Sequence, residues 1–277
     1  MWQRNSSVNL RMPRMLLDRI LEAKRAAVER KKSRIPLREI MARAQARQAP
    51  GIAAAASEKF IIIGETKKAS PSAGIIVPYY RADIIARSYQ RAGASAVSVL
   101  TEEKFFLGSM RDLAKVKSSV SIPVLAKDFV IDPYQVYEAR AYGADALLLI
   151  RRILDLPLFR ELFSLACNLG MDVLMEAHTL EECESILETA GTNPHAILGI
   201  NNRDLDTLEI HIETTFHLRR LLKQVKIPII SESGIKDADT LAKLHDAGIN
   251  GALVGEYLLR SLPNRNAIFE FLQKING

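Results

Sequence analysis

The chain has 277 residues, of which 48% are hydrophobic and 25% charged, so it can build a large core and is not a disordered chain. Its length suits a single α/β barrel. The formal net charge of +6 comes from residues 1–50, which hold 13 Lys and Arg against 4 Asp and Glu. Neither a membrane-spanning apolar run nor a secretory signal segment occurs, so we expect a cytoplasmic protein with no membrane partner.

The first predicted element is an amphipathic helix over residues 11–29. Leu17, Ile20, Leu21 and Val28 form one apolar stripe along it, and the basic residues form the outer face. We therefore expect residues 1–58 to form an N-terminal helical extension and residues 59–277 to form the main domain.

Eight short apolar runs follow the extension, and none of them alternates with polar residues. Continuous apolar runs of this length are typical of strands buried on both faces of a parallel sheet. Their starts are 22 to 36 residues apart, which is the length of a strand–helix unit. The runs cover residues 60–66, 96–101, 124–127, 146–150, 171–176, 196–201, 227–232 and 251–255.

Amphipathic helices are predicted between and after these strands. They cover residues 81–91, 109–116, 133–142, 156–169, 180–189, 212–222, 237–246 and 264–275. Gly143, Gly170 and Gly248 stand at the expected C-terminal ends of three of them. Eight strands that alternate with eight helices predict a (β/α)8 barrel. A doubly wound open sheet is the main alternative, although it would normally have fewer strands and a glycine-rich first turn.

Polar residues collect at the C-terminal ends of the predicted strands. In a (β/α)8 barrel these ends open onto one face, where active sites lie. A single charge of this kind is most simply a solvated strand end, but polar groups at six of eight ends favour one acid–base pocket. Five of these ends carry Glu65, Lys67, Lys127, Glu176, Asn201, Arg203 and Glu232, and the sixth is the polar run TEEK (101–104) after the second strand.

Residues at the ends of the seventh and eighth predicted strands also predict a phosphate site. Ser233 and Gly234 follow the seventh predicted strand and Gly255 ends the eighth, where barrels commonly bind phosphate. Glycine lets backbone N–H groups approach an anion closely. His211 and His217 lack the spacing of zinc ligands, so we expect no metal site, and no dinucleotide-binding or P-loop motif occurs.

Five motifs extend over nearly the whole predicted barrel. They are KKASPS (67–72), SVLTEEKFFLGS (98–109), PVLAKDFVIDPYQVYEARAYGADALLLI (123–150), GINNRDL (199–205) and ISESGI (230–235). Together, and in this order, they resemble the indole-3-glycerol phosphate synthase family, and residues 17–32 look like the N-terminal helix of that family. The resemblance implies a (β/α)8 fold with a helical extension over the barrel mouth. It also implies conversion of 1-(2-carboxyphenylamino)-1-deoxyribulose 5-phosphate to indole-3-glycerol phosphate in tryptophan biosynthesis, without a cofactor.

The same resemblance implies roles for the strand-end residues. Lys127 matches a lysine that protonates the substrate ketone oxygen, Glu176 a general base or acid, and Lys67 a lysine near the substrate carboxylate and phosphate. The resemblance leaves open how these three residues divide the proton transfers. Glu65, Asn201 and Glu232 match groups that orient the substrate hydroxyls and the lysines. The implied binding residues are Phe106 and Phe129 around the anthranilate ring, Arg203, and Ser70, Ser233, Gly234 and Gly255 at the phosphate.

Two other functions are open to comparison. Phosphoribosylanthranilate isomerase is similar in its barrel and phosphate site, but resemblance to that family would imply a cysteine base after the first strand and an aspartate acid after the sixth. This chain has Glu65 and Asn201 at those places. A non-enzymatic binder of nucleic acid or anionic membrane could use the basic N-terminal helix, but would not explain the strand-end charges. We therefore expect a small phosphorylated substrate, no nucleic-acid partner, other tryptophan-pathway enzymes as neighbours, and a monomer by default.

Overall fold

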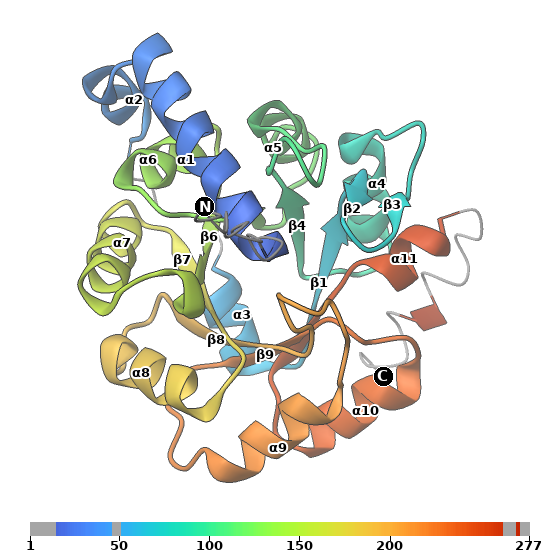
Figure 1. The fold of residues 1–277 in the computed structure, drawn as a ribbon. Helices are drawn as coiled ribbons and strands as arrows, with labels where there is room; N and C mark the ends of the chain where they lie inside the picture. The colour runs from blue at the N-terminus through green and yellow to red at the C-terminus, as the bar shows by residue number, and fades with distance from the viewer. Residues whose placement is uncertain (1–14, 46–50, 263–269, 272–277) are drawn as a thin grey trace, which may run out of the picture.

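The computed structural model, which describes residues 15–45, 51–262 and 270–271, contains a closed barrel of eight parallel strands (Figure 1). The order around the barrel is β1-β10-β9-β8-β7-β6-β5-β4, and β1 pairs with both β10 and β4. The barrel strands are β1 (Ile61–Thr66), β4 (Ala96–Leu100), β5 (Val124–Lys127), β6 (Ala146–Ile150), β7 (Asp172–Ala177), β8 (Ala196–Asn201), β9 (Ile229–Glu232) and β10 (Gly251–Val254). The predicted (β/α)8 fold is confirmed, and the open sheet is wrong because no barrel strand has an unpaired edge.

Helices surround the barrel, and most of them begin and end near the predicted residues (Figure 1). They are α4 (Ala82–Arg91), α5 (Met110–Lys117), α6 (Pro133–Ala141), α7 (Leu156–Asn168), α8 (Leu180–Ala190), α9 (Glu213–Leu221), α10 (Ala238–Asp246) and α11 (Glu256–Arg260), with a 3-10 turn η1 (Arg151–Ile153). A small antiparallel hairpin of β2 (Ala69–Ser70) and β3 (Gly74–Ile75) follows β1. The predicted helix over 264–275 lies outside the described residues except for residues 270–271, which are helical.

Local chemistry explains where the helices begin and end. The side chains of Ser109 and Asp132 accept N–H bonds at the starts of α5 and α6, which satisfies donors that a helix leaves unpaired. Gly143, Gly170 and Gly248 have φ values of 96°, 71° and 73°, a left-handed conformation that glycine adopts at little cost. The three predicted glycine stops are therefore confirmed.

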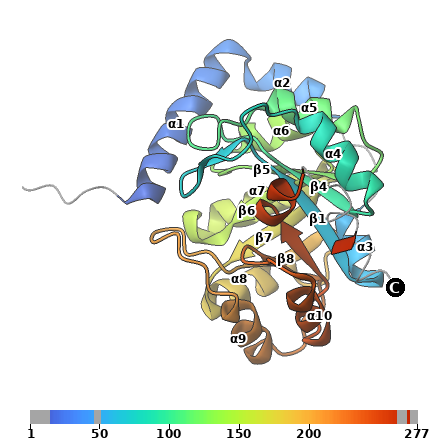
Figure 2. The ribbon, with the colours of Figure 1, turned by 90° about the vertical axis from the view of Figure 1, so that its right-hand side faces the viewer.

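The N-terminal segment contributes helices to both ends of the barrel. It forms α1 (Leu16–Arg34), α2 (Leu37–Arg43) and α3 (Ile52–Glu58). Figure 2 places α1 and α3 at opposite ends of the barrel. Ile20 and Val28 of α1 are buried as the apolar stripe predicts. The outer position expected for the basic residues is wrong for Lys24, whose side chain is buried.

The barrel strands alternate between an inner and an outer face. Ile61 and Ile63 point to the interior cluster, where they pack with Ile52 of α3, whereas Ile62 packs in the outer cluster against the surrounding helices. Each strand thus places every second residue inside the barrel.

Among the described residues, no helix is long and apolar enough to cross a membrane.

Candidate active site

Four charged residues form the upper layer of the barrel interior. Glu65, Lys127, Glu176 and Glu232 lie near the ends of β1, β5, β7 and β9, which are alternate strands around the barrel. Alternate strands normally supply one layer of four apolar side chains to a barrel core. The residues two positions earlier are Ile63, Leu125, Leu174 and Ile230, and these are the apolar, buried layer below. The strand period therefore puts one ammonium and three carboxylates on top of a dry core.

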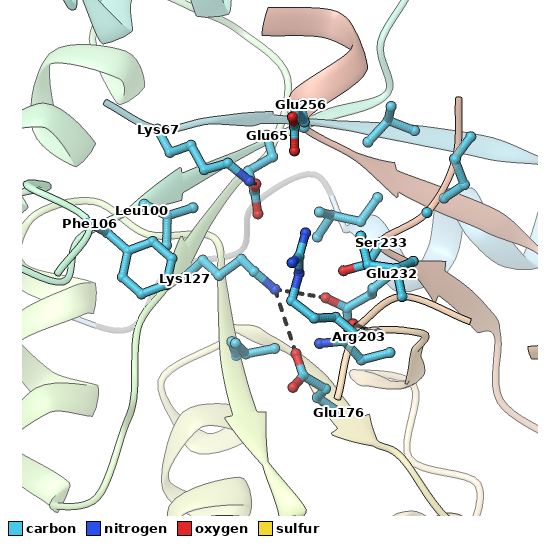
Figure 3. A pocket seen from close by; sticks show the side chains of 18 of the residues that line it. Glu65, Lys67, Leu100, Phe106, Lys127, Glu176, Arg203, Glu232, Ser233 and Glu256 are labelled. Atoms are coloured by element: carbon cyan, nitrogen blue, oxygen red, sulfur yellow. Dashed lines mark hydrogen bonds and ion pairs between the residues drawn. The ribbon is translucent and has the colours of Figure 1, made fainter. Parts of the chain in front are cut away.

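Lys127 lies at the centre of this charged layer (Figure 3). Its Nζ donates to Glu232 Oε2 at 2.7 Å and lies 3.6 Å from Glu176 Oε2. The Nζ of Lys67 forms a second ion pair with Glu65 Oε1. Glu176 Oε1 and Glu232 Oε1 are buried and accept no hydrogen bond from any described residue. The layer therefore retains acceptor capacity that a ligand could use.

The surrounding charges set the ionisation of these groups. Burial alone would lower the pKa of Lys127, but the nearby carboxylates, Glu232 first, raise it above its ordinary value. Burial would raise the pKa of Glu65, yet Lys67 and Lys127 hold it below its ordinary value. Burial and the Glu176 carboxylate raise the pKa of Glu232 to about 7, against the opposing effect of Lys127. At neutral pH the layer thus holds a protonated lysine beside a carboxyl group that can gain or lose a proton.

The charged layer forms the floor of a cavity of about 550 Å³. Twelve of the thirteen candidate residues line it: Glu65, Lys67, Phe106, Lys127, Phe129, Glu176, Asn201, Arg203, Glu232, Ser233, Gly234 and Gly255. Ser70 is not brought to the cavity. Its Oγ lies 3.4 Å from Ser72 Oγ and accepts from the Ala73 N–H, both within the β2–β3 hairpin.

One wall of the cavity is aromatic. The rings of Phe106 and Phe129 lie with centroids 6.2 Å apart and a tilt of 41°. The loop of Phe106 is held by Glu102, whose carboxylate accepts the N–H groups of Lys104, Phe105 and Phe106 at 3.0, 2.6 and 3.0 Å. Glu102 was not among the predicted site residues. The wall offers a rigid apolar surface that suits a flat ring.

The turn after β9 forms another part of the cavity. Ser233 and Gly234 both have positive φ values, 67° and 82°. The side-chain amide of Asn202 donates to the carbonyls of Glu232 at 2.9 Å and Ser233 at 3.0 Å, so it holds this turn in place. A Cβ on Gly234 would lie 2.8 Å from Ile210 Cγ2. The turn therefore requires glycine, and Asn202 is a positioning residue that sequence reasoning missed.

Gly255, at the end of β10, lies close to the charged layer. A Cβ there would come within 2.4 Å of Glu65 Oε1 and 3.2 Å of Lys67 Nζ. The next residue, Glu256, also lines the cavity, and its carboxylate accepts from Arg260 Nε at 2.9 Å and Nη2 at 2.7 Å. That pairing with Arg260 offsets a negative charge that would otherwise oppose an anion near Gly255.

Arg203 connects two loops at the cavity rim. Its backbone N–H donates to Asn201 Oδ1 at 3.0 Å, which fixes the end of β8. Its Nη1 donates to the Leu208 carbonyl at 3.0 Å and to Ser72 Oγ at 3.4 Å. Arg203 therefore joins the loop after β8 to the β2–β3 hairpin and brings a further positive charge to the cavity.

The sequence is similar to known proteins that share one family name. The family model described as indole-3-glycerol phosphate synthase matches residues 17–271. A relative of that name from Carboxydothermus hydrogenoformans is 40% identical, over 93% of this chain and 99% of the relative. Another from Dehalococcoides mccartyi is 43% identical, over 90% of this chain and 96% of the relative. One from Desulfotalea psychrophila is 47% identical, over 72% of this chain and 75% of the relative.

Solved structures show a more distant likeness. Thiamine phosphate pyrophosphorylase from Pyrococcus furiosus superposes with a TM-score of 0.57 at 14% identity, covering 80% of this chain and 97% of that one. At this identity the likeness concerns the fold alone. The family rests instead on the match over residues 17–271 and on the identity to full-length relatives. The chain therefore belongs to the indole-3-glycerol phosphate synthase family.

Proposed function

We propose that the cavity converts 1-(2-carboxyphenylamino)-1-deoxyribulose 5-phosphate to indole-3-glycerol phosphate, the reaction of its family in tryptophan biosynthesis. The observation that carries this function is the layer of one lysine among three buried glutamates, next to an aromatic wall and a glycine turn. An acid and a base are needed within one dry pocket for this reaction. The layer supplies both at neutral pH.

The substrate is oriented by its two unlike ends. Its anthranilate ring packs against Phe106 and Phe129, and its phosphate binds the backbone near Ser233, Gly234 and Gly255. This orientation puts the substrate ketone over Lys127. The backbone N–H groups of the turn and the cations around it favour a dianion at that end. The aromatic wall favours the ring at the other end.

Lys127 is the general acid of ring closure. The ring carbon that carries the carboxylate bonds to the ketone carbon, and the ketone oxygen takes a proton from Lys127 Nζ. Release of CO2 then leaves its bonding electron pair in the ring and restores aromaticity. A buried ammonium with a raised pKa is an effective stabiliser of the developing oxyanion, because few water molecules screen it.

Dehydration completes the indole. The new hydroxyl leaves as water after it gains a proton, for which Lys67 is the donor. Glu176 removes the proton from the former methylene carbon, which forms the second double bond of the new ring. Glu65, Asn201 and Glu232 hold the lysines and the substrate hydroxyls in place. Overall the substrate loses one CO2 and one water.

The test is an assay of the purified protein with the carboxyphenylamino-deoxyribulose phosphate. The wild type should produce indole fluorescence, and Lys127→Met should reduce kcat by about 10²- to 10⁴-fold, the range for loss of a general acid. Lys223→Met, on the exposed surface after α9, is the matched control and should retain full turnover. Absence of product from the wild type would exclude the function, and normal turnover in Lys127→Met would exclude Lys127 as the acid.

We further propose that the enzyme acts in the cytoplasm as a monomer and alongside other enzymes of the tryptophan pathway. A small phosphorylated substrate, taken up from solution, fits the open cavity. Sedimentation of the purified protein, alone and with the other pathway enzymes, would test the assembly state. A stable dimer would contradict the monomer.

A further inference from the structure

A buried ion pair joins the N-terminal helix to the strand end that carries Lys127. Lys24 Nζ of α1 lies 2.6 Å from Asp128 Oδ1, and the two side chains are only 4% and 3% exposed. Asp128 directly follows Lys127 and lines the cavity. An ion pair this deeply buried loses the hydration of both charges, so it needs good geometry and further hydrogen bonds to persist.

Asp128 makes those further hydrogen bonds within the active-site strand ends. Its Oδ1 accepts the backbone N–H of Phe129 at 2.7 Å, and its Oδ2 accepts the Thr101 hydroxyl at 2.9 Å. The backbone N–H of Thr101 donates to the Lys127 carbonyl at 3.0 Å. The carboxylate therefore connects three points: the catalytic lysine's backbone, the end of β4 and the aromatic wall.

The apolar side of α1 reaches the same place. Ile20, one turn before Lys24, is buried in the interior cluster that contains Phe129 and Leu253, both of which line the cavity. Helix α1 thus belongs to the apolar cluster that includes the aromatic wall, and it also forms an ion pair at the Lys127 strand end. Figure 2 shows α1 standing at this end of the barrel.

We propose that Lys24 is a positioning residue for the reaction, because its ion pair with Asp128 fixes the backbone between Lys127 and Phe129 in the catalytic arrangement. This inference rests on the proposed function. Lys24 contacts neither the cavity nor the substrate, so it acts only through Asp128. A displacement of about 1 Å in a reacting group can cost about a hundredfold in rate, so a contact outside the cavity can control turnover.

The same helix supplies a matched control. Lys31 of α1 also binds the barrel, at 3.0 Å from Glu138 Oε2 and 3.1 Å from Glu103 Oε1. Neither glutamate is part of the cavity lining. Lys31→Met therefore removes a comparable attachment of α1 and leaves the contacts of Asp128 intact.

The test compares Lys24→Met, Lys24→Arg and Lys31→Met by kcat, KM and thermal unfolding. Lys24→Met should lower kcat by about tenfold or more, Lys24→Arg should recover most of it because the charge is kept, and Lys31→Met should stay within about twofold of wild type while losing stability. A Lys24→Met enzyme that loses stability but keeps the wild-type kcat would overturn the proposal, because attachment alone would then be its role.

A second variant decides the matter if Lys24→Met does not fold. Thr101→Val removes the hydroxyl hydrogen bond to Asp128 Oδ2 without touching α1, and should lower kcat by about threefold or more. An unchanged kcat in folded Thr101→Val would overturn the proposal in that case. The wild-type assay separates the two ideas: an inactive wild type contradicts the proposed function, whereas an active wild type with a normal Lys24→Met contradicts only the role of Lys24.

Discussion

Strand β7 carries a buried carboxylate at each end, and the two carboxylates have opposite surroundings. At the barrel base, Asp172 Oδ2 accepts the Ala53 N–H of α3 at 2.9 Å, and Oδ1 accepts His195 Nδ1–H at 2.8 Å. At the mouth, Glu176 Oε2 faces Lys127 at 3.6 Å, and Oε1 accepts no hydrogen bond from the part of the chain described. The base carboxylate has hydrogen-bond partners from the fold itself. The mouth carboxylate has two charged or ionisable neighbours, Lys127 at 3.6 Å and His178 at 3.5 Å, but no hydrogen bond from the described residues.

This difference separates stability from function along one strand. A buried acceptor with two hydrogen bonds stabilises the structure, whereas a buried acceptor without them lowers stability unless a ligand completes it. Ile52 and Ala56 of α3 also close the base with apolar contacts, whereas the mouth opens into the cavity. Substitutions at the base should therefore lower the unfolding free energy, whereas substitutions at the mouth should lower turnover or substrate binding.

The largest expected effect is at the mouth. Glu176→Gln keeps the shape of the side chain but removes the proposed base, so kcat should fall by about 10²- to 10⁴-fold. The free energy of unfolding should stay the same or rise slightly, because one of three clustered negative charges is removed. Kinetic assays and urea unfolding on the same preparation measure both quantities. A large loss of stability would show that Glu176 belongs with Asp172 and not with a catalytic pocket.

The mouth was more predictable from sequence than the contacts that hold it. The end of a parallel strand must open at the mouth, so Glu65, Lys127 and Glu232 could be placed together from strand order alone. Asn202 could not, because its partners Ser231 and Thr215 are 29 and 13 residues away and become neighbours only in the closed barrel.

The N-terminal segment shows the same limit. The apolar stripe predicted burial of Ile20, but basic side chains on a helix are usually exposed, and only the position of Asp128 explains why Lys24 is buried. The short helix α3 was missed because a run of five residues from Ala53 to Ser57 has little amphipathic pattern. Ser70 was placed at the phosphate by resemblance, whereas the hairpin uses its hydroxyl locally.

Gly251, which begins β10, and Gly255, which directly follows β10, provide the next comparison. A Cβ on Gly251, at the base, would lie 2.5 Å from the Ile61 backbone oxygen, which cannot move without disturbing the sheet. Gly251→Ala should therefore cost about 3 kcal/mol of unfolding free energy. A Cβ on Gly255 would instead meet the ends of the Glu65 and Lys67 side chains, which can rotate.

Gly255→Ala should therefore change function more than stability. We expect KM to rise about tenfold, because the added methyl group displaces groups next to the proposed phosphate position. Chemical denaturation and substrate titration of both variants measure the contrast. Equal losses of stability in Gly251→Ala and Gly255→Ala would contradict the separation of the two ends.

A smaller effect is expected for the base carboxylate. Asp172→Asn turns one acceptor into a donor that faces either the Ala53 N–H or His195, so unfolding free energy should fall by about 2 kcal/mol. Turnover should remain within about twofold of wild type, because neither Asp172 nor α3 lines the cavity. A calorimetric melt and a kinetic assay test this pair of outcomes. A tenfold loss of kcat at unchanged stability would mean that the base communicates with the mouth.

The last expected effect is the pH dependence that Glu232 gives to stability. Its pKa is raised from 4.5 to about 7 in the fold by burial and by Glu176. Between pH 4.5 and about pH 7, Glu232 keeps its proton in the folded protein but loses it in the unfolded chain. The resulting contribution to the unfolding free energy is therefore fully present below about pH 4.5 and is lost as the pH rises through about 7. The protein should therefore become less stable as the pH rises from about 4.5 to about 7.

Glu232→Gln removes this titration and offers the measurement. The unfolding free energy of wild type, relative to that of Glu232→Gln, should fall by about 2 to 3 kcal/mol between pH 5 and pH 8. Glu184→Gln, on the exposed surface of α8, controls for the loss of a carboxylate elsewhere and should follow the wild type. A constant difference between wild type and Glu232→Gln would mean that Lys127 keeps Glu232 ionised throughout, and that the proton available near neutrality comes from another group in the layer.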